Sequence, residues 1–139
     1  MHVKQIMTKH MDSLPPNASL QEASSSMLEH NFGFLPVEEN RTLVGVVTDR
    51  DITIHGVAKN LGPDTPLSQV MTKNVIIVHE EDDVHTAASI MEQGHVRRLV
   101  VLDQNEKLSG IVSLSDIATK CEHADISGAI VRAVSEKSR

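Results

Sequence analysis

Apolar residues recur at helical spacing in two segments of the chain. In the first segment, Leu20, Ala23 and Met27 fall on one helical face. Ser19 precedes them and Glu22 follows it by three residues, which is the pattern of a capping box at the start of a helix. The second segment repeats this pattern, with Asp83 as the cap before Val84, Ala87 or Ala88, and Met91. The chain is therefore expected to contain two matching amphipathic helices.

Two short apolar runs follow each predicted helix. They span residues 34–37 and 43–48 in one case, and residues 98–102 and 108–113 in the other. The polar turns EENR and DQNE separate them, so each pair of runs predicts a tight antiparallel hairpin. A further helix is expected to begin at TDRDI and at SLSDI. Each unit thus reads as a strand, a helix, two strands and a helix.

These two units form an internal repeat. Residues 3–52 align with residues 67–117 when one residue is inserted near Asn105. Identical pairs run through the whole unit: Met7/Met71, Thr8/Thr72, Lys9/Lys73, Ala23/Ala87, Met27/Met91, Leu35/Leu99, Val37/Val101, Leu43/Leu108, Gly45/Gly110, Asp51/Asp116 and Ile52/Ile117. One such half can hardly bury both faces of its small sheet, whereas two halves packed sheet to sheet can. The repeat therefore predicts an α+β fold built from two copies.

The repeat also sets the expected boundaries. The copies occupy residues 3–59 and 67–121, joined by a linker at 60–66 that contains glycine and prolines. A C-terminal tail follows at 122–139. Its apolar residues form one stripe of a short helix: Ile126, Ala129, Ile130, Ala133 and Val134. This helix is expected either to close the domain or to contact a second copy of the chain.

Composition limits the possible partners. The 139 residues carry a net charge of −6 and include two Phe but no Tyr or Trp, which argues against binding nucleic acid. The single cysteine, Cys121, excludes an internal disulfide and fits a reducing compartment. No apolar run approaches the roughly 18 residues that span a bilayer, and no signal peptide opens the chain. We expect a cytoplasmic protein with no nucleic-acid or membrane partner.

Two short motifs occur at matching places in both copies. MT lies near the start of each copy, and a glycine, two apolar residues, Thr or Ser, two further residues and Asp lie near its end. Within the full-length repeat, these motifs resemble the cystathionine-β-synthase (CBS) domain pair. The stretch VTDRDITIHGVAKNL is also similar to stand-alone bacterial CBS proteins, including hypoxic-response proteins. The resemblance covers the chain from Val3 to about Cys121.

The resemblance implies a pseudo-twofold pair of repeats with two clefts between them that bind adenosine-containing ligands. It also implies a homodimer that forms a flat disc of four repeats. The expected function is a regulatory sensor of AMP, ADP, ATP or NAD that requires no cofactor and signals to a partner which the sequence does not name. The alternative is a ligand-independent scaffold for dimerisation or protein interaction.

The residue types of the second motif fit this chemistry. Its glycine lets a ligand, or the backbone of the other repeat, approach closely. The hydroxyl of Thr48 or Ser113, with free N–H groups at the helix start, can meet a phosphate or ribose oxygen. The carboxylate of Asp51 or Asp116 accepts two hydrogen bonds, which suits the ribose 2′- and 3′-hydroxyls. Each Asp could instead only complement the helix N-terminus, but its occurrence in both copies favours ribose binding.

The cations differ between the copies. The resemblance assigns phosphate binding to the basic pair Arg97 and Arg98, whose equivalents Gly33 and Phe34 are uncharged, while Arg50 is a further cation of the first copy. The MT threonines either contact the nucleotide or form a turn. Two unequal clefts are therefore expected. The predicted nucleotide-binding residues are Thr8, Thr48, Asp49, Arg50, Asp51, Thr72, Arg97, Arg98, Ser113, Leu114, Ser115 and Asp116.

Metal binding and catalysis are the other classes to weigh. The eight histidines lack the compact spacing of a zinc site, so we interpret them as scattered surface residues. Cys121 and His123 are close in sequence, so a metal site shared across a dimer interface remains an alternative. No nucleophile elbow or P-loop is present, and no Cys–His constellation. Asp51 and Asp116 are expected in separate clefts, which is the wrong arrangement for one active site. We expect no catalysis.

Overall fold

The computed structural model describes residues 1–9 and 12–121, and it divides into two compact units. The first-repeat unit spans Met11–Val75, and the second-repeat unit combines Met1–His10 with Ile76–Arg139. The predicted helix in the tail lies outside the described residues. Among the residues described, no helix is both long enough and apolar enough to cross a membrane.

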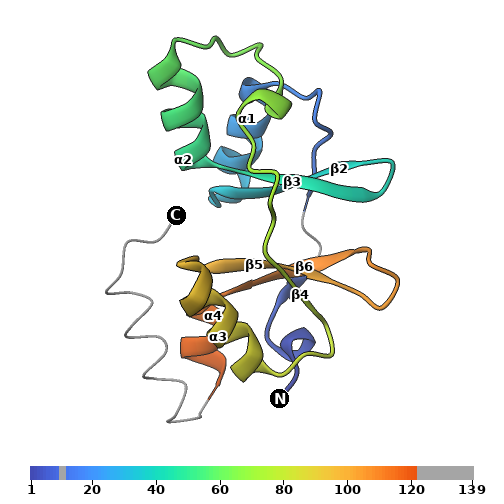
Figure 1. The fold of residues 1–139 in the computed structure, drawn as a ribbon. Coiled ribbons are helices and arrows are strands. Elements are labelled where there is room, and N and C mark those ends of the chain that lie inside the picture. Colours follow the sequence, from blue (N-terminus) through green and yellow to red (C-terminus); the bar gives the residue numbers. More distant parts are fainter. Residues whose placement is uncertain (10–11, 122–139) are drawn as a thin grey trace. The chain divides into compact units, whose positions relative to one another are not determined.

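The first-repeat unit places its helices on one face of a hairpin (Figure 1). Ser19 starts α1 as expected, because its hydroxyl accepts the Glu22 N–H at 3.1 Å. The helix ends at Asn31, whose φ of 51° is left-handed. The elements of this unit are α1 (Leu20–His30), β2 (Phe34–Glu39), β3 (Thr42–Thr48), the continuous helical segment α2 (Asp49–Asp51), η2 (Ile52–Gly56) and η3 (Val57–Lys59), and the turn η4 (Leu67–Gln69).

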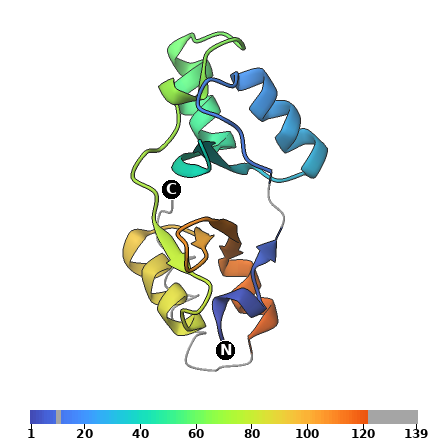
Figure 2. The same ribbon diagram turned by 90° about the vertical axis from the view of Figure 1, so that its right-hand side faces the viewer.

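The second-repeat unit has a four-stranded sheet in the order β1-β6-β5-β4, with both of its helices on one face (Figures 1 and 2). The pair β4–β5 is parallel, and the other two pairs are antiparallel. The elements are η1 (Val3–Gln5), β1 (Thr8–Lys9), β4 (Ile77–His79), α3 (Val84–Gly94), β5 (Arg98–Leu102), β6 (Leu108–Ser113) and α4 (Leu114–Lys120). The predicted α+β fold with two repeats is confirmed.

The first-repeat unit has counterparts of all four strands of this sheet, but two of the counterparts are single β-bridges. Leu14 lies parallel to Val37 beside β2, and Thr72 lies antiparallel to Val46 beside β3. Thr72 and Val46 exchange both backbone hydrogen bonds, at 2.8 and 3.0 Å. Leu14 thus takes the place of β4, and Thr72 takes the place of β1.

The start of each sequence repeat completes the sheet of the other repeat. β1 precedes the first helix in sequence but pairs with β6, and Thr72 follows the linker but pairs with β3. The compact units therefore do not coincide with the expected segments 3–59 and 67–121. The motif glycines permit the exchange: a methyl group at Gly45 would lie 2.8 Å from the Thr72 carbonyl oxygen, and one at Gly110 would overlap that of Thr8.

Each unit has its own apolar core under its helices. Apart from Phe34, the buried apolar side chains are aliphatic, as the scarcity of aromatic residues predicts. The first core contains Ala18, Leu20, Ala23, Met27, Leu35, Val37, Val47, Leu67 and Val70. The second contains Val3, Ile6, Met7, Val78, Val84, Ala87, Ala88, Met91, Leu99, Val101, Val112, Leu114 and Ile117. The N-terminal segment therefore supplies core residues to the second-repeat unit.

The close approach at Gly110 gives a stability prediction. We expect Gly110→Ala to lower the free energy of unfolding by about 1–3 kcal/mol, because the added methyl group forces β1 away from β6. Gly62→Ala is the matched control, since nothing lies within 4 Å of a methyl group there and its φ is not positive. Urea denaturation of both variants measures the difference. Equal stabilities would show that β1 is not tightly packed at Gly110.

Candidate functional site

The hydroxyl and the aspartate of each motif form a reciprocal capping box. In the first-repeat unit, Thr48 Oγ1 accepts the Asp51 N–H and Asp51 Oδ2 accepts the Thr48 N–H, both at 3.0 Å. In the second-repeat unit, Ser113 Oγ accepts the Asp116 N–H at 3.0 Å and Asp116 Oδ2 accepts the Ser113 N–H at 2.9 Å. Both aspartates thus have the structural role that was weighed against ribose binding. Any ligand must use what the boxes leave open.

The second carboxylate oxygen distinguishes the two aspartates. Asp116 Oδ1 accepts a hydrogen bond from Lys120 Nζ at 3.1 Å. Within residues 1–9 and 12–121, Asp51 Oδ1 has no hydrogen-bond or ion-pair partner. Although it carries a charge, the Asp51 residue is only 9% exposed, and it is the one buried charged residue in that part of the chain. Asp51 is therefore largely buried, but its unpaired Oδ1 reaches the surface, because no fully buried side-chain oxygen of the described residues lacks a partner.

Most of the backbone N–H groups at the two helix starts are already satisfied. Asp49 donates to the Gly33 carbonyl at 3.1 Å, and Arg50 donates to Asp49 Oδ1 at 2.9 Å. In the other unit, Leu114 donates to the Arg97 carbonyl at 2.8 Å. The expectation of free N–H groups is wrong at these positions, because the carbonyl of the preceding strand and the Asp49 carboxylate occupy them.

The predicted residues between Ser113 and Asp116 differ in access. Leu114 is 6% exposed and belongs to the apolar core, so its role as a ligand residue stays a prediction. Its backbone N–H is also used, as described above. Ser115 is exposed on α4.

The arginine pair lies at the end of the second-repeat unit where the capping box forms. Arg97 and Arg98 are exposed, and Arg98 pairs with Ser113 across β5 and β6. Phe34 pairs with Thr48 at the same place in the first-repeat unit. The equivalence read from the repeat therefore holds in three dimensions. Cations accompany one capping box, and uncharged residues accompany the other at these positions.

The threonine of each MT motif pairs with a strand of the other repeat. Thr8 pairs with Ile111 in the second-repeat unit, and Thr72 pairs with Val46 in the first-repeat unit. Both residues are exposed. Thr72 therefore lies in the same unit as the Thr48–Asp51 capping box, and Thr8 lies in the same unit as the Ser113–Asp116 capping box.

Arg50 borders a shallow, open hollow on the first-repeat unit. The hollow is lined by Asp49, Arg50, Thr53 and Ile54. These residues lie on the exposed side of the helical segment that begins at the capping box. Three predicted residues of the first copy, Asp49, Arg50 and Asp51, are therefore adjacent in this segment.

A protein-family model matches most of the chain. The model, described as the CBS domain, matches residues 3–56 and 67–123. The chain belongs to the CBS domain family. Both capping boxes fall inside the matched ranges, so they are features of two CBS repeats.

One relative of this CBS protein matches it over nearly its full length. It is the CBS domain-containing protein YhcV of Bacillus subtilis, which is 35% identical over 136 residues that cover 98% of this chain and 96% of YhcV. Homoserine O-acetyltransferase of Methanocorpusculum labreanum is also 35% identical, over 115 residues. The 115 matched residues cover 81% of this chain but only 23% of that enzyme. The likeness to the enzyme is therefore a likeness to about a quarter of it.

The chain is similar to many solved structures, among them two CBS structures that contain adenosine compounds. PAE2072 of Pyrobaculum aerophilum, complexed with AMP, is 26% identical with a TM-score of 0.80 over 94% of this chain and 98% of that one. The CBS domain pair of protein MJ0100, with 5′-methylthioadenosine and S-adenosylmethionine, is 32% identical with a TM-score of 0.76 over 85% and 93%. Hypoxic Response Protein I, with two coordinated zinc ions, is 31% identical with a TM-score of 0.77 over 85% and 97%.

Several histidines of this CBS pair form pairs with carboxylates on the surface. His79 lies 2.8 Å from Glu106, and His85 lies 2.7 Å from Asp83. Hydrogen bonds from the His85 backbone and ring hold the pKa of Asp83 below its usual value. The described part of the chain contains no group of three His, Cys, Asp or Glu residues that could hold a metal ion. His10 and His123 fall outside that part.

Lys120 is the residue at this site that sequence reasoning did not identify. It follows Asp116 by four residues, a spacing that places two side chains together on an α-helix and is readable from sequence. His55 occupies the same position relative to Asp51. Its segment η2 is a π-helical turn, which no feature of the composition indicates.

The capping boxes give a second stability prediction. We expect Ser113→Ala to lower the free energy of unfolding by about 0.5–2 kcal/mol, because the Asp116 N–H loses its acceptor at the start of α4. Ser115→Ala is the matched control, since the exposed Ser115 hydroxyl caps no helix. Chemical denaturation compares the two variants. A loss of the same size in both would mean that the Ser113 hydroxyl does not support the helix.

Proposed function

We propose that this CBS pair is a regulatory module that binds an adenosine-containing nucleotide and catalyses no reaction. The observation that carries the proposal is the buried Asp51 carboxylate, whose Oδ2 is fixed by the Thr48 N–H while Oδ1 is unused by the described residues. A fixed carboxylate can accept both hydroxyls of a ribose diol without first being ordered. The AMP complex of the Pyrobaculum relative and the adenosine compounds bound to MJ0100 support this ligand class.

The remaining predicted residues are assigned on the same basis. Thr48, Asp49, Arg50 and Thr72 lie in the first-repeat unit with Asp51. Arg50 supplies a guanidinium group next to Asp51 for phosphate oxygens, which such forks bind bidentately, and the roles of Arg97 and Arg98 stay predictions. The ligand acts only through its different affinity for two states of the protein, and a downstream protein reads the change. The cytoplasmic location and the downstream partner stay predictions.

A thermal-shift series tests the ligand class. AMP, ADP, ATP, NAD and S-adenosylmethionine are each added at millimolar concentration. We expect at least one to raise the melting temperature by several degrees, because a ligand at 100 times its Kd stabilises the folded state by about 2.7 kcal/mol. If none changes the melting temperature, the sensor function is wrong and the ligand-independent scaffold takes its place.

Asp51→Asn tests the site. Asn can still accept the Thr48 N–H, but it lacks the charge that strengthens hydrogen bonds to ribose, so we expect the affinity for the best nucleotide to fall about tenfold to a hundredfold. Asp64→Asn is the control, since Asp64 is an exposed acid of the same unit and lies outside the capping box. Isothermal titration calorimetry measures both. An unchanged affinity in Asp51→Asn would contradict the assignment.

We also propose that the pair forms a homodimer through the helices of the first-repeat unit. Three large apolar side chains are exposed there: Leu28 at 84%, Val57 at 68% and Ile54 at 42%. A second copy of the chain would cover them, which exposed apolar groups favour.

Val57→Glu tests the dimer. We expect it to shift the chain to monomer in size-exclusion chromatography with light scattering, because it places a charge in the apolar contact. Lys59→Glu, two residues away and already polar, should leave the dimer intact. A dimer that survives Val57→Glu would place the interface elsewhere.

A further inference from the structure

We propose that Lys120 shields Asp116, so that the chain binds one adenine nucleotide, through Asp51, and not two. This inference rests on the proposed function, because it concerns which of the two capping-box aspartates can hold a ribose. The internal repeat alone would predict two equivalent carboxylates. The hydrogen bonds around them are different.

Lys120 is held by two acceptors. Its ammonium group donates to Asp116 Oδ1 at 3.1 Å and to the Ile6 carbonyl oxygen at 3.0 Å. Ile6 belongs to the N-terminal segment, which packs into the core of the second-repeat unit. Lys120 therefore links that segment to α4 through a partly buried hydrogen bond, and it is more than a surface ion pair.

With Lys120 in place, both oxygens of Asp116 are in use. Oδ2 accepts the Ser113 N–H and Oδ1 accepts the ammonium group. A ribose diol donates two hydrogen bonds, so it would have to displace Lys120 to gain the second oxygen. Displacement would leave the Ile6 carbonyl without that donor, and an unpaired buried carbonyl is unfavourable. It would also require the ammonium group to move away from a carboxylate that it neutralises.

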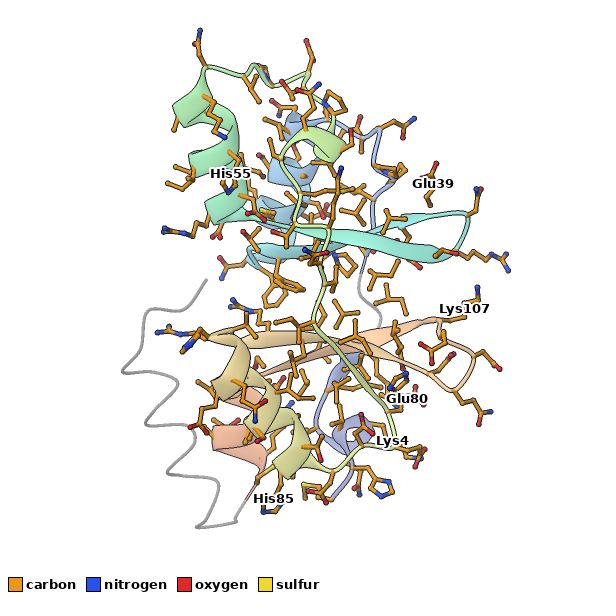
Figure 3. All side chains as sticks on the ribbon, viewed as in Figure 1. Lys4, Glu39, His55, Glu80, His85 and Lys107 are labelled. Atoms are coloured by element: carbon orange, nitrogen blue, oxygen red, sulfur yellow. The ribbon has the colours of Figure 1, made fainter. Side chains whose placement is uncertain are left out.

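In the first-repeat unit, no described residue forms such a shield over Asp51. His55 stands four residues after Asp51 and is exposed, and Figure 3 labels it on the helical segment. Side chains four residues apart lie close on an α-helix, and η2 is a π-helical turn in which the Val57 N–H reaches the carbonyls of Ile52 and Thr53. Among the described residues, His55 makes no hydrogen bond or ion pair with Asp51, so it does not occupy the carboxylate as Lys120 occupies that of Asp116. Asp51 Oδ1 thus stays open to a ligand.

The difference can be measured as the stoichiometry of AMP binding in calorimetry. The wild-type chain should bind one AMP. Lys120→Met removes the charge and the donor, so it should expose Asp116 and raise the stoichiometry to two. Lys120→Arg keeps both and should bind one. Lys107→Met, an exposed lysine of the same unit labelled in Figure 3, is the control and should also bind one.

The new site must depend on Asp116. The double variant Lys120→Met/Asp116→Asn should return to one AMP per chain. The melting temperature without nucleotide shows whether each variant folds, and Lys120→Gln replaces Lys120→Met if the loss of the bond to Ile6 unfolds the chain. Gln is neutral and shorter than Lys, so its amide can bind the Ile6 carbonyl without neutralising Asp116, and Lys120→Gln should also give two.

Each outcome bears on a different claim. Two AMP per wild-type chain, or one AMP in a folded Lys120→Met and Lys120→Gln, would overturn the shielding by Lys120 and leave the nucleotide sensor intact. No binding of AMP or any other adenosine compound by the wild-type chain would overturn the proposed function itself, and the shielding with it.

Discussion

The reciprocal hydrogen bonds between hydroxyl and aspartate fix the point at which each hairpin turns into a helix. Thr48 and Asp51 satisfy each other's backbone N–H groups, and Ser113 and Asp116 do the same. Without such a cap, the backbone N–H groups at the start of each helix would lose these acceptors. The bonds also orient the carboxylates, so the chemistry of each site depends on what the cap leaves unused.

The sheets depend on a second constraint, which is the close passage of a backbone over a glycine. Thr8 crosses Gly110, and Thr72 crosses Gly45, where a side chain would collide with the crossing carbonyl. The glycines were expected to admit a ligand or the backbone of the other repeat, and the backbone is what lies there. The crossing strands carry the MT motifs and thus bring their threonines into the unit of the opposite repeat.

Much of this could be predicted from the sequence, because it follows from local patterns. The cap at Ser19, the two hairpins and the match of Phe34 with Arg98 follow from periodicity and the repeat. The exchange of the first segments could not be predicted, since both copies carry the same MT motif and the same glycine, and either pairing satisfies the pattern. The burial of Leu114 also depends on tertiary packing, because an apolar residue in the first turn of a helix can face either way.

The inequality of the two sites arises from single residues that the repeat does not conserve between its copies. Lys120 donates to Asp116, whereas His55, four residues after Asp51, makes no hydrogen bond or ion pair with Asp51 among the described residues. A crystal structure of the wild-type chain with AMP tests this most directly. We expect the ribose hydroxyls to lie within hydrogen-bond distance of Asp51, with Lys120 still bonded to Asp116. A ribose bound to Asp116, or one bound away from Asp51, would contradict it.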